Sequence, residues 1–138
     1  MRKLFNKIFP GLVSSHPKTV DRDGLTYHQD TNELVTGIVE SFHSNGQLEW
    51  RGNYIVGERE GLTELFYKNG QLHVRSNYKN GKREGLEETF HRNGQLGIRG
   101  NYKNGWQNGL WEFFEEDGTL DSAQTFRNGK RIETNRNP

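Results

Sequence analysis

The chain has 138 residues, of which 30% are hydrophobic, 17 are glycine and none is cysteine. This length fits one domain, and so low a hydrophobic content excludes a thick enclosed core. The lack of cysteine excludes a disulfide framework, a thiolate nucleophile and cysteine-based zinc sites. Because aromatic residues make up 12% and are spread along the chain, the composition favours a thin, turn-rich β structure over disorder.

The net charge of +1 hides an uneven distribution. Residues 1–23 carry five Lys or Arg and two Asp, and residues 127–138 carry four Lys or Arg and one Glu. The body between them carries 10 basic and 15 acidic residues, and its acidic excess falls in residues 109–126, which contain no Lys or Arg. A surface built from this segment repels nucleic acid and attracts a basic partner.

Residues 1–23 form a basic N-terminal segment that we interpret as a cap or tail. Asn6, Lys7 and Pro10 interrupt the apolar stretch that a secretory signal peptide needs, and no apolar run reaches the roughly 18 residues of a membrane span. We therefore expect a cytoplasmic protein. Residues 1–9 combine basic side chains with apolar ones at i,i+4 spacing, so membrane contact is one interpretation of this segment. A cap over the first hairpin or a frayed tail is the favoured one, because two turns are marginal for a lone helix.

Residues 24–131 repeat with a period of 24, and residues 132–138 form a C-terminal tail. Asn-Gly or Asp-Gly between short alternating segments predicts a β-hairpin. Such turns recur at Asn45-Gly46, Asn69-Gly70, Asn93-Gly94 and Asp117-Gly118. A second turn leads to each next hairpin, around Gly57, Asn80-Gly81, Asn104-Gly105 and Asn128-Gly129. The repeat therefore predicts an all-β fold, an elongated single-layer antiparallel meander of stacked β-hairpins.

In chain order, the predicted strands are 38–43, 47–54, 62–67, 72–78, 86–91, 96–102, 110–115 and 119–126. Two registers compete within each hairpin. A two-residue turn at Asn69-Gly70 pairs Glu64 with Arg75 and makes a ladder of salt bridges, each worth about 0.2–1 kcal/mol. A three-residue turn pairs Phe66 with Leu72 instead. We favour the second, because burying large apolar side chains is worth about 1.5–3 kcal/mol each. It places on one face an apolar spine of Leu62, Phe66, Leu72, Val74 and Tyr78.

The sequence predicts no catalytic, cofactor-binding or metal-ligating residue. His43 and His91 occupy the same repeat position two units apart, about 19 Å from each other at a strand spacing of about 4.8 Å. They cannot share a metal. The repeated glutamates lie about 9.6 Å apart by the same arithmetic, too far for the carboxylate pair of a retaining glycosidase.

A partner-binding site is predicted in the last hairpin, where exposed aromatic rings adjoin unpaired acids, a composition typical of interfaces. Its candidate residues are Trp106, Trp111, Phe113, Glu115, Glu116, Asp117 and Asp121. In the favoured register Trp111 and Phe113 project away from the spine and into water. One alternative is that the basic segment of Arg127, Lys130 and Arg131 covers this hairpin. Another places the site on the face that carries His43, Tyr67 and His91.

The pattern G-L-x-E-x-F-x-x-N-G-x-L-x-x-R-G-N-Y-x-N-G resembles the bacterial variant of the MORN repeat. The opening DGLTYHQDTNELVTG, followed by IVESFHSNGQL, is similar to the start of YwqK-type antitoxin proteins. The resemblance covers about residues 22–131 and implies a non-enzymatic protein-binding surface. It implies an antitoxin or immunity protein that neutralises a cognate protein toxin, for which the acidic last hairpin suggests a basic surface. The alternative is a non-enzymatic scaffold or membrane-peripheral adaptor.

Overall fold

The computed structural model describes residues 12–13 and 18–132, so the predicted roles of residues 1–9 and 133–138 lie outside the described residues. The strands are β1 (Leu12–Val13), β2 (Thr19–Arg22), β3 (Leu25–His28), β4 (Gly37–Phe42), β5 (Leu48–Ile55), β6 (Glu58–Phe66), β7 (Leu72–Lys79), β8 (Lys82–Arg83), β9 (Gly85–Phe90), β10 (Leu96–Lys103), β11 (Trp106–Phe114), β12 (Leu120–Arg127) and β13 (Lys130–Ile132). No helix in the described part of the chain is long and apolar enough to span a membrane.

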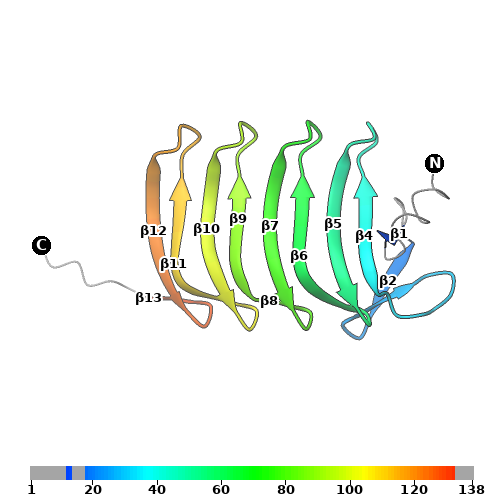
Figure 1. Cartoon of the computed structure of the whole chain (residues 1–138). Helices are drawn as coiled ribbons and strands as arrows, with labels where there is room; N and C mark the ends of the chain where they lie inside the picture. Colours follow the sequence, from blue (N-terminus) through cyan, green and yellow to red (C-terminus); the bar gives the residue numbers. More distant parts are fainter. Residues whose placement is uncertain (1–11, 14–17, 133–138) are drawn as a thin grey trace, which may run out of the picture.

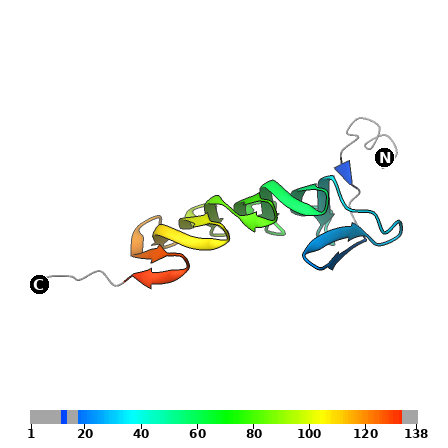
Figure 2. The same ribbon diagram turned by 90° about the horizontal axis from the view of Figure 1, so that it is seen from below.

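Eleven of these strands form one sheet, in the spatial order β1-β4-β5-β6-β7-β9-β10-β11-β12-β13 with β8 beside β7 (Figure 1). Apart from the parallel pair β1 and β4, neighbouring strands are antiparallel. Strands β2 and β3 form a separate hairpin at the N-terminal end, and Figure 2 shows the large sheet as a single layer. The predicted meander of stacked hairpins is confirmed.

Two kinds of turn alternate along the sheet. The upper turns of Figure 1 are three-residue loops, such as Ser44 to Gly46, in which His43 N–H donates to Gln47 O at 2.8 Å and Gly46 has φ 86°. The lower turns have two central residues with positive φ, such as Asn80 (51°) and Gly81 (80°), as in type I′ turns. The strands therefore continue to the lower turns, so β6 and β11 begin four residues earlier than predicted, at Glu58 and Trp106.

The two competing registers both occur, in the same hairpin. Phe66 pairs with Leu72 next to the upper turn, but a bulge follows and Glu64 pairs with Arg75. Paired residues share a face of the sheet and side chains alternate along a strand. The bulge therefore moves Val74 and Tyr78 to the face opposite Phe66, so the predicted spine is wrong in these two residues.

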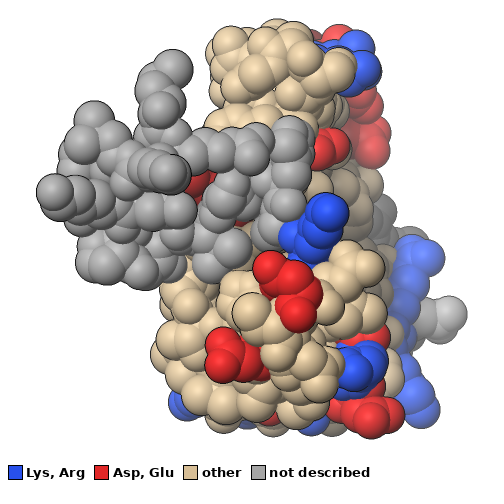
Figure 3. All heavy atoms as spheres, turned by 90° about the vertical axis from the view of Figure 1, so that its right-hand side faces the viewer, with Lys and Arg blue, Asp and Glu red and all other residues tan. Residues whose placement is uncertain are grey.

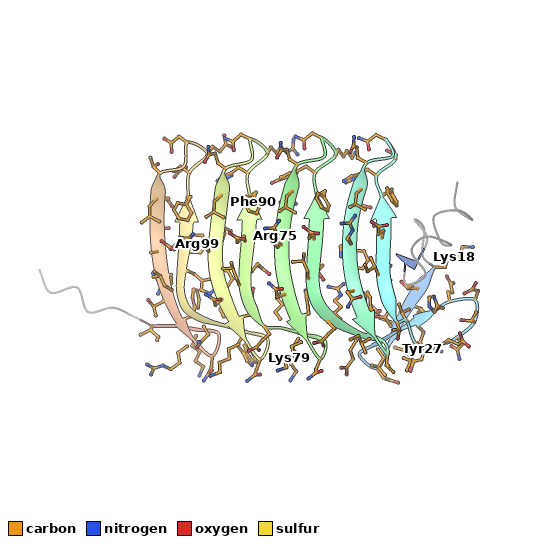
Figure 4. The ribbon with its side chains drawn as sticks, viewed as in Figure 1. Lys18, Tyr27, Arg75, Lys79, Phe90 and Arg99 are labelled. Atoms are coloured by element: carbon orange, nitrogen blue, oxygen red, sulfur yellow. The ribbon has the colours of Figure 1, made fainter. Side chains whose placement is uncertain are left out.

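The two faces are named here after their aromatic rows. The Phe face carries Phe42, Phe66, Phe90 and Phe114 with Leu48, Leu72, Leu96 and Leu120, and a row of alternating Glu and Arg. The Tyr face carries Tyr54, Tyr78, Tyr102 and Phe126. Figure 4 shows Phe90 near the upper turns, Arg75 and Arg99 midway along their strands and Lys79 at a lower turn.

The apolar core lies at the two ends of the Tyr face. At the N-terminal end Val35, Val39 and Tyr54 are buried and Trp50 packs against them. The β2–β3 hairpin adds to this end, because Thr26 N–H donates to Gly57 O at 2.9 Å. In the middle of the face small polar side chains are buried instead, including those of Thr63 and Ser76.

At the C-terminal end, Trp111 is only 3% exposed, so the prediction that its ring lies in water is wrong. A β-carbon on Gly100 would lie 2.1 Å from indole Cδ2, so the ring occupies space that only glycine leaves open. Tyr102 and Phe126 meet the ring edge-on, with centroids at 5.1 and 6.3 Å. Its Nε1–H donates to Asn101 O at 3.1 Å.

We expect Phe66→Ala and Phe90→Ala each to lower the free energy of unfolding by about 2–3 kcal/mol, below the usual range for a fully buried Phe, because both rings are half-buried. Leu62→Ala, at an exposed position of the same face, is the control and costs less than about 1 kcal/mol. Urea denaturation measures all three. Equal midpoints for the three variants would contradict the burial of the Phe row.

Gly100 and Trp111 provide a second test, as a double-mutant cycle. We expect Gly100→Ala to cost about 1–3 kcal/mol by overpacking and Trp111→Ala about 3–5 kcal/mol. In the Trp111→Ala background the added methyl group meets no ring, so Gly100→Ala then costs much less. Denaturation of all four proteins measures the coupling, and strictly additive costs would contradict this packing.

Candidate functional site

The residues of the predicted partner site do not form one surface. Trp106 begins β11 at a lower turn and Glu115 follows its upper end, about 30 Å away at about 3.3 Å per residue. Trp111 lies between them in the core, and Phe113 is half-buried on the same face. The structure therefore divides the candidates into an acidic loop, a core and an exposed lower tryptophan. Whether they bind a partner stays a prediction.

The C-terminal acidic loop consists of Glu115, Glu116, Asp117 and Asp121, all of which are exposed. No Lys or Arg nitrogen of the described residues lies within 4.0 Å of their carboxylates. Asp117 accepts the backbone N–H of Thr119 at 2.9 Å and its hydroxyl at 2.6 Å, and these hydrogen bonds lower the pKa of Asp117. These hydrogen bonds therefore favour the charged form of Asp117.

A charge ladder on the Phe face ends in the same hairpin. Arg51 lies between Glu40 and Glu64, at 2.9 and 4.0 Å. The pattern continues to Arg99 and Glu112, which are 3.0 Å apart. Glu112 then pairs with Ala123, which stands where an arginine would continue the ladder. The ladder itself matches the register that the sequence analysis disfavoured.

The basic segment after β12 does not cover the acidic loop. Arg127 pairs with Lys130, and Phe126 with Arg131, across the lower turn at Asn128-Gly129. That turn is at the opposite end of β12 from Asp117. The alternative in which Arg127, Lys130 and Arg131 neutralise these acids is therefore wrong.

Trp106 lies in basic surroundings. Its side chain is 60% exposed and packs on Gly129, where an added β-carbon would lie 2.6 Å from indole Cε3. The ring borders an open hollow of about 580 Å³ that Lys103, Asn104, Asn128 and Lys130 also line. The field at this lower edge is opposite in sign to that of the acidic loop.

The alternative face around His43, Tyr67 and His91 is engaged in stacking the hairpins. The ring Nε2 of His43 lies 2.8 Å from Phe66 O, and that of His91 lies 2.8 Å from Phe114 O. Tyr67 donates its hydroxyl to the carbonyl oxygen of Phe90 at 2.7 Å. Each side chain thus bonds the backbone of the next hairpin. In the described part of the chain no group of three His, Asp or Glu side chains is placed to hold a metal ion.

The Tyr face carries an arginine row that the sequence analysis missed. Arg59 Nε donates to the Tyr54 hydroxyl at 3.1 Å and its Nη1 to the Tyr78 hydroxyl at 3.2 Å. Burial by itself lowers the pKa of Arg59, but these contacts outweigh it and raise that pKa. The signal was available, because a two-residue turn at Val56-Gly57 pairs Tyr54 with Arg59. The sequence analysis did not consider this pairing, because it favoured a register with one apolar spine.

A second cavity, of about 210 Å³, opens beside Arg59. The side chains of Tyr54, Tyr78, Asp21 and Thr26 line it, together with the turn glycines Gly24, Gly57 and Gly81. It lies between the β2–β3 hairpin and the first lower turns of the large sheet. The described residues therefore include three candidate sites: the acidic loop, the basic hollow at Trp106 and the Arg59 cavity.

Comparison with known proteins identifies the repeats. The family model described as "MORN repeat variant" matches residues 35–55, 59–80, 83–104 and 107–128. No protein of curated function is significantly similar to the chain in sequence.

Among solved structures, one similar chain is a mutant of Staphylococcus aureus TarM in complex with fondaparinux, alpha-GlcNAc-glycerol and UDP. The identity is 13% and the TM-score 0.44, over 97% of this chain and 24% of that chain. The chain thus spans about a quarter of the length of that protein, and this likeness carries no argument about function. The four matched segments and the hairpin geometry agree, and the chain belongs to the MORN repeat variant family.

Proposed function

We propose that the chain is a non-enzymatic antitoxin or immunity protein that binds and neutralises a cognate protein toxin through its last hairpin. MORN repeats are generally non-enzymatic modules, which supports a binding role. The observation that carries the choice of surface is the C-terminal acidic loop, whose carboxylates have no cation within 4.0 Å among the described residues. A toxin with a basic surface is attracted by this loop and forms charge-assisted hydrogen bonds with it.

Exposed apolar groups for such an interface lie in the same hairpin as the loop. Leu110 and Leu120 of the last hairpin are each 55% exposed on the Phe face. The equivalents of Leu120 in earlier hairpins, Leu48, Leu72 and Leu96, are half-buried. An apolar centre with a charged rim is the usual anatomy of a protein interface. The last hairpin therefore has charged groups that attract a basic toxin and apolar side chains that the toxin could bury.

The edge of the sheet adds a third contribution. Strand β13 pairs only with residues Thr125 to Arg127 of β12. In the part of the chain that the structure describes, residues 120–124 have no strand on their outer side. An open edge accepts a strand from a partner. A toxin segment that pairs there would lie next to the acidic loop.

The basic hollow at Trp106 favours the alternative of a non-enzymatic scaffold or peripheral adaptor. An exposed indole flanked by Lys103 and Lys130 suits an anionic surface rather than a basic toxin. The two roles use opposite ends of the same hairpin. Variants at one end therefore distinguish them.

We expect the variant Glu116→Lys with Asp121→Lys to weaken toxin binding more than about tenfold, or roughly 1.4 kcal/mol, because it reverses the charge of the loop. The toxin to test is the product of the neighbouring reading frame. Calorimetry measures the affinity, and co-expression measures protection of the cells. The affinity of the wild-type protein falls as salt is raised.

The matched control is Glu49→Lys, since Glu49 occupies the repeat position of Asp121 three units earlier and is also exposed. All variants are first checked for wild-type melting temperature. Unchanged affinity and full protection by the double variant would rule out the acidic loop as the toxin site. Loss of binding to anionic liposomes in Trp106→Ala, with toxin binding unchanged, would favour the adaptor role.

A further inference from the structure

Arg59 and Arg83 occupy the same repeat position but have different counter-groups. Arg83 Nε lies 3.3 Å from the Glu87 carboxylate, which also accepts the Ser76 hydroxyl at 2.7 Å. One unit earlier, Thr63 replaces this glutamate and Gly52 replaces the serine. No carboxylate oxygen of the described residues lies within 4.0 Å of the Arg59 nitrogens. Arg59 is therefore a half-buried guanidinium without a counterion there.

Two aromatic rings contact the Arg59 guanidinium and partly compensate for the missing carboxylate. The Arg59 guanidinium carbon lies 5.5 Å from the Trp50 ring centroid and 5.2 Å from that of Tyr78. A β-carbon on Gly52 would lie 2.8 Å from indole Cζ2, so the Trp50 ring covers this stretch of the sheet. Cation–π contacts hold the guanidinium in place but leave its net charge unneutralised.

The 210 Å³ cavity collects hydrogen-bond donors around this charge. A guanidinium has five N–H donors, and the hydroxyls of Tyr54 and Tyr78 accept two of them. Each of these hydroxyls already accepts from Arg59, so its own proton remains available to an acceptor. Among the described residues, neither phenol hydroxyl donates a hydrogen bond to another protein group. Unused donors that converge on a positive charge form a site for an anion.

We propose that the Arg59 cavity binds a carboxylate group, held by the guanidinium and the phenol protons of Tyr54 and Tyr78. The ligand carboxylate supplies to Arg59 the charge that Glu87 supplies to Arg83. This site lies at the N-terminal end of the sheet, away from the C-terminal acidic loop. It is independent of the proposed toxin site.

The charge of the cavity favours a monoanion over a dianion. Asp21 also lines the cavity, and its carboxylate accepts the Thr26 hydroxyl at 2.6 Å. Viewed from the N-terminal end, acidic and basic side chains are intermixed over this part of the molecule (Figure 3). One positive charge beside one negative charge suits a planar carboxylate, which matches the guanidinium fork, better than a phosphate dianion.

The test is an NMR titration of the full chain with sodium acetate, followed at the amides of Gly24, Gly57 and Gly81. We expect saturable shifts for the wild-type protein and a dissociation constant at least about tenfold higher for Arg59→Gln. Tyr78→Phe keeps the ring and removes one donor, so it raises the constant severalfold. Arg131→Gln is the matched control, because Arg131 occupies the repeat position of Arg59 three units later and does not line the cavity, and it changes the constant less than about twofold.

Two further probes identify the source of the carboxylate, N-acetylglycine for a chain terminus and N-acetylglutamate α-amide for an acidic side chain. Tighter binding of either than of acetate points to a protein segment, and equal binding points to a small free acid. The absence of saturable shifts, or equal constants for the wild-type protein and Arg59→Gln, would overturn the proposal. If Arg59→Gln fails to fold, an unchanged constant in Tyr78→Phe overturns it. Tighter binding of inorganic phosphate would overturn the carboxylate class.

Discussion

Each hairpin of the large sheet is buried chiefly by the hairpins on either side of it, because in the described residues only the β2–β3 hairpin lies against this single layer, at its N-terminal end. Burial must then come from side chains that lie across neighbouring strands. The Trp111 ring over Gly100 is the clearest case, since a methyl group at that glycine would collide with it. His43, Tyr67 and His91 serve the same purpose with hydrogen bonds, each to the backbone of the next unit. Stability therefore passes from neighbour to neighbour, as in other repeat proteins.

Because each hairpin is buried by its neighbours, the two ends of the sheet differ chemically from its middle. At the N-terminal end, Val35 stands where later units have Arg59 and Arg83, and the β2–β3 hairpin lies beside it. At the C-terminal end, Trp111 and Phe126 close the Tyr face. The Phe face has no such closure, because Leu120 is 55% exposed. A hairpin that lacks one neighbour keeps apolar and charged groups unpartnered, which is what the proposed toxin site uses.

Single departures from the repeat change the local chemistry at three places in the sheet. Ala123 removes the arginine that would neutralise Glu112 on its outer side, and it thereby ends the ladder in acid. Thr63 removes the carboxylate that would neutralise Arg59. Trp106 puts an indole where other units have Glu58, Lys82 or Lys130. In each case the backbone stays the same and the local balance of charge changes. The repeats thus provide internal controls for the experiments on both proposed sites.

The sequence by itself determined the 24-residue period, the hairpin meander, the order of the repeat strands and the positions of both turns, because Asn-Gly turns and alternation are local signals. Only the tertiary structure decided the faces. The bulge at His73 lets Phe66 pair with Leu72 while Glu64 pairs with Arg75. The sequence analysis compared two registers that were each uniform along the hairpin, so it could not predict this combination. Trp111 was placed in water because the space over Gly100 belongs to a neighbouring strand. The Arg59 cavity was likewise invisible, since it combines Asp21 of the first hairpin with Tyr54 and Tyr78, and such proximity follows from packing rather than from spacing.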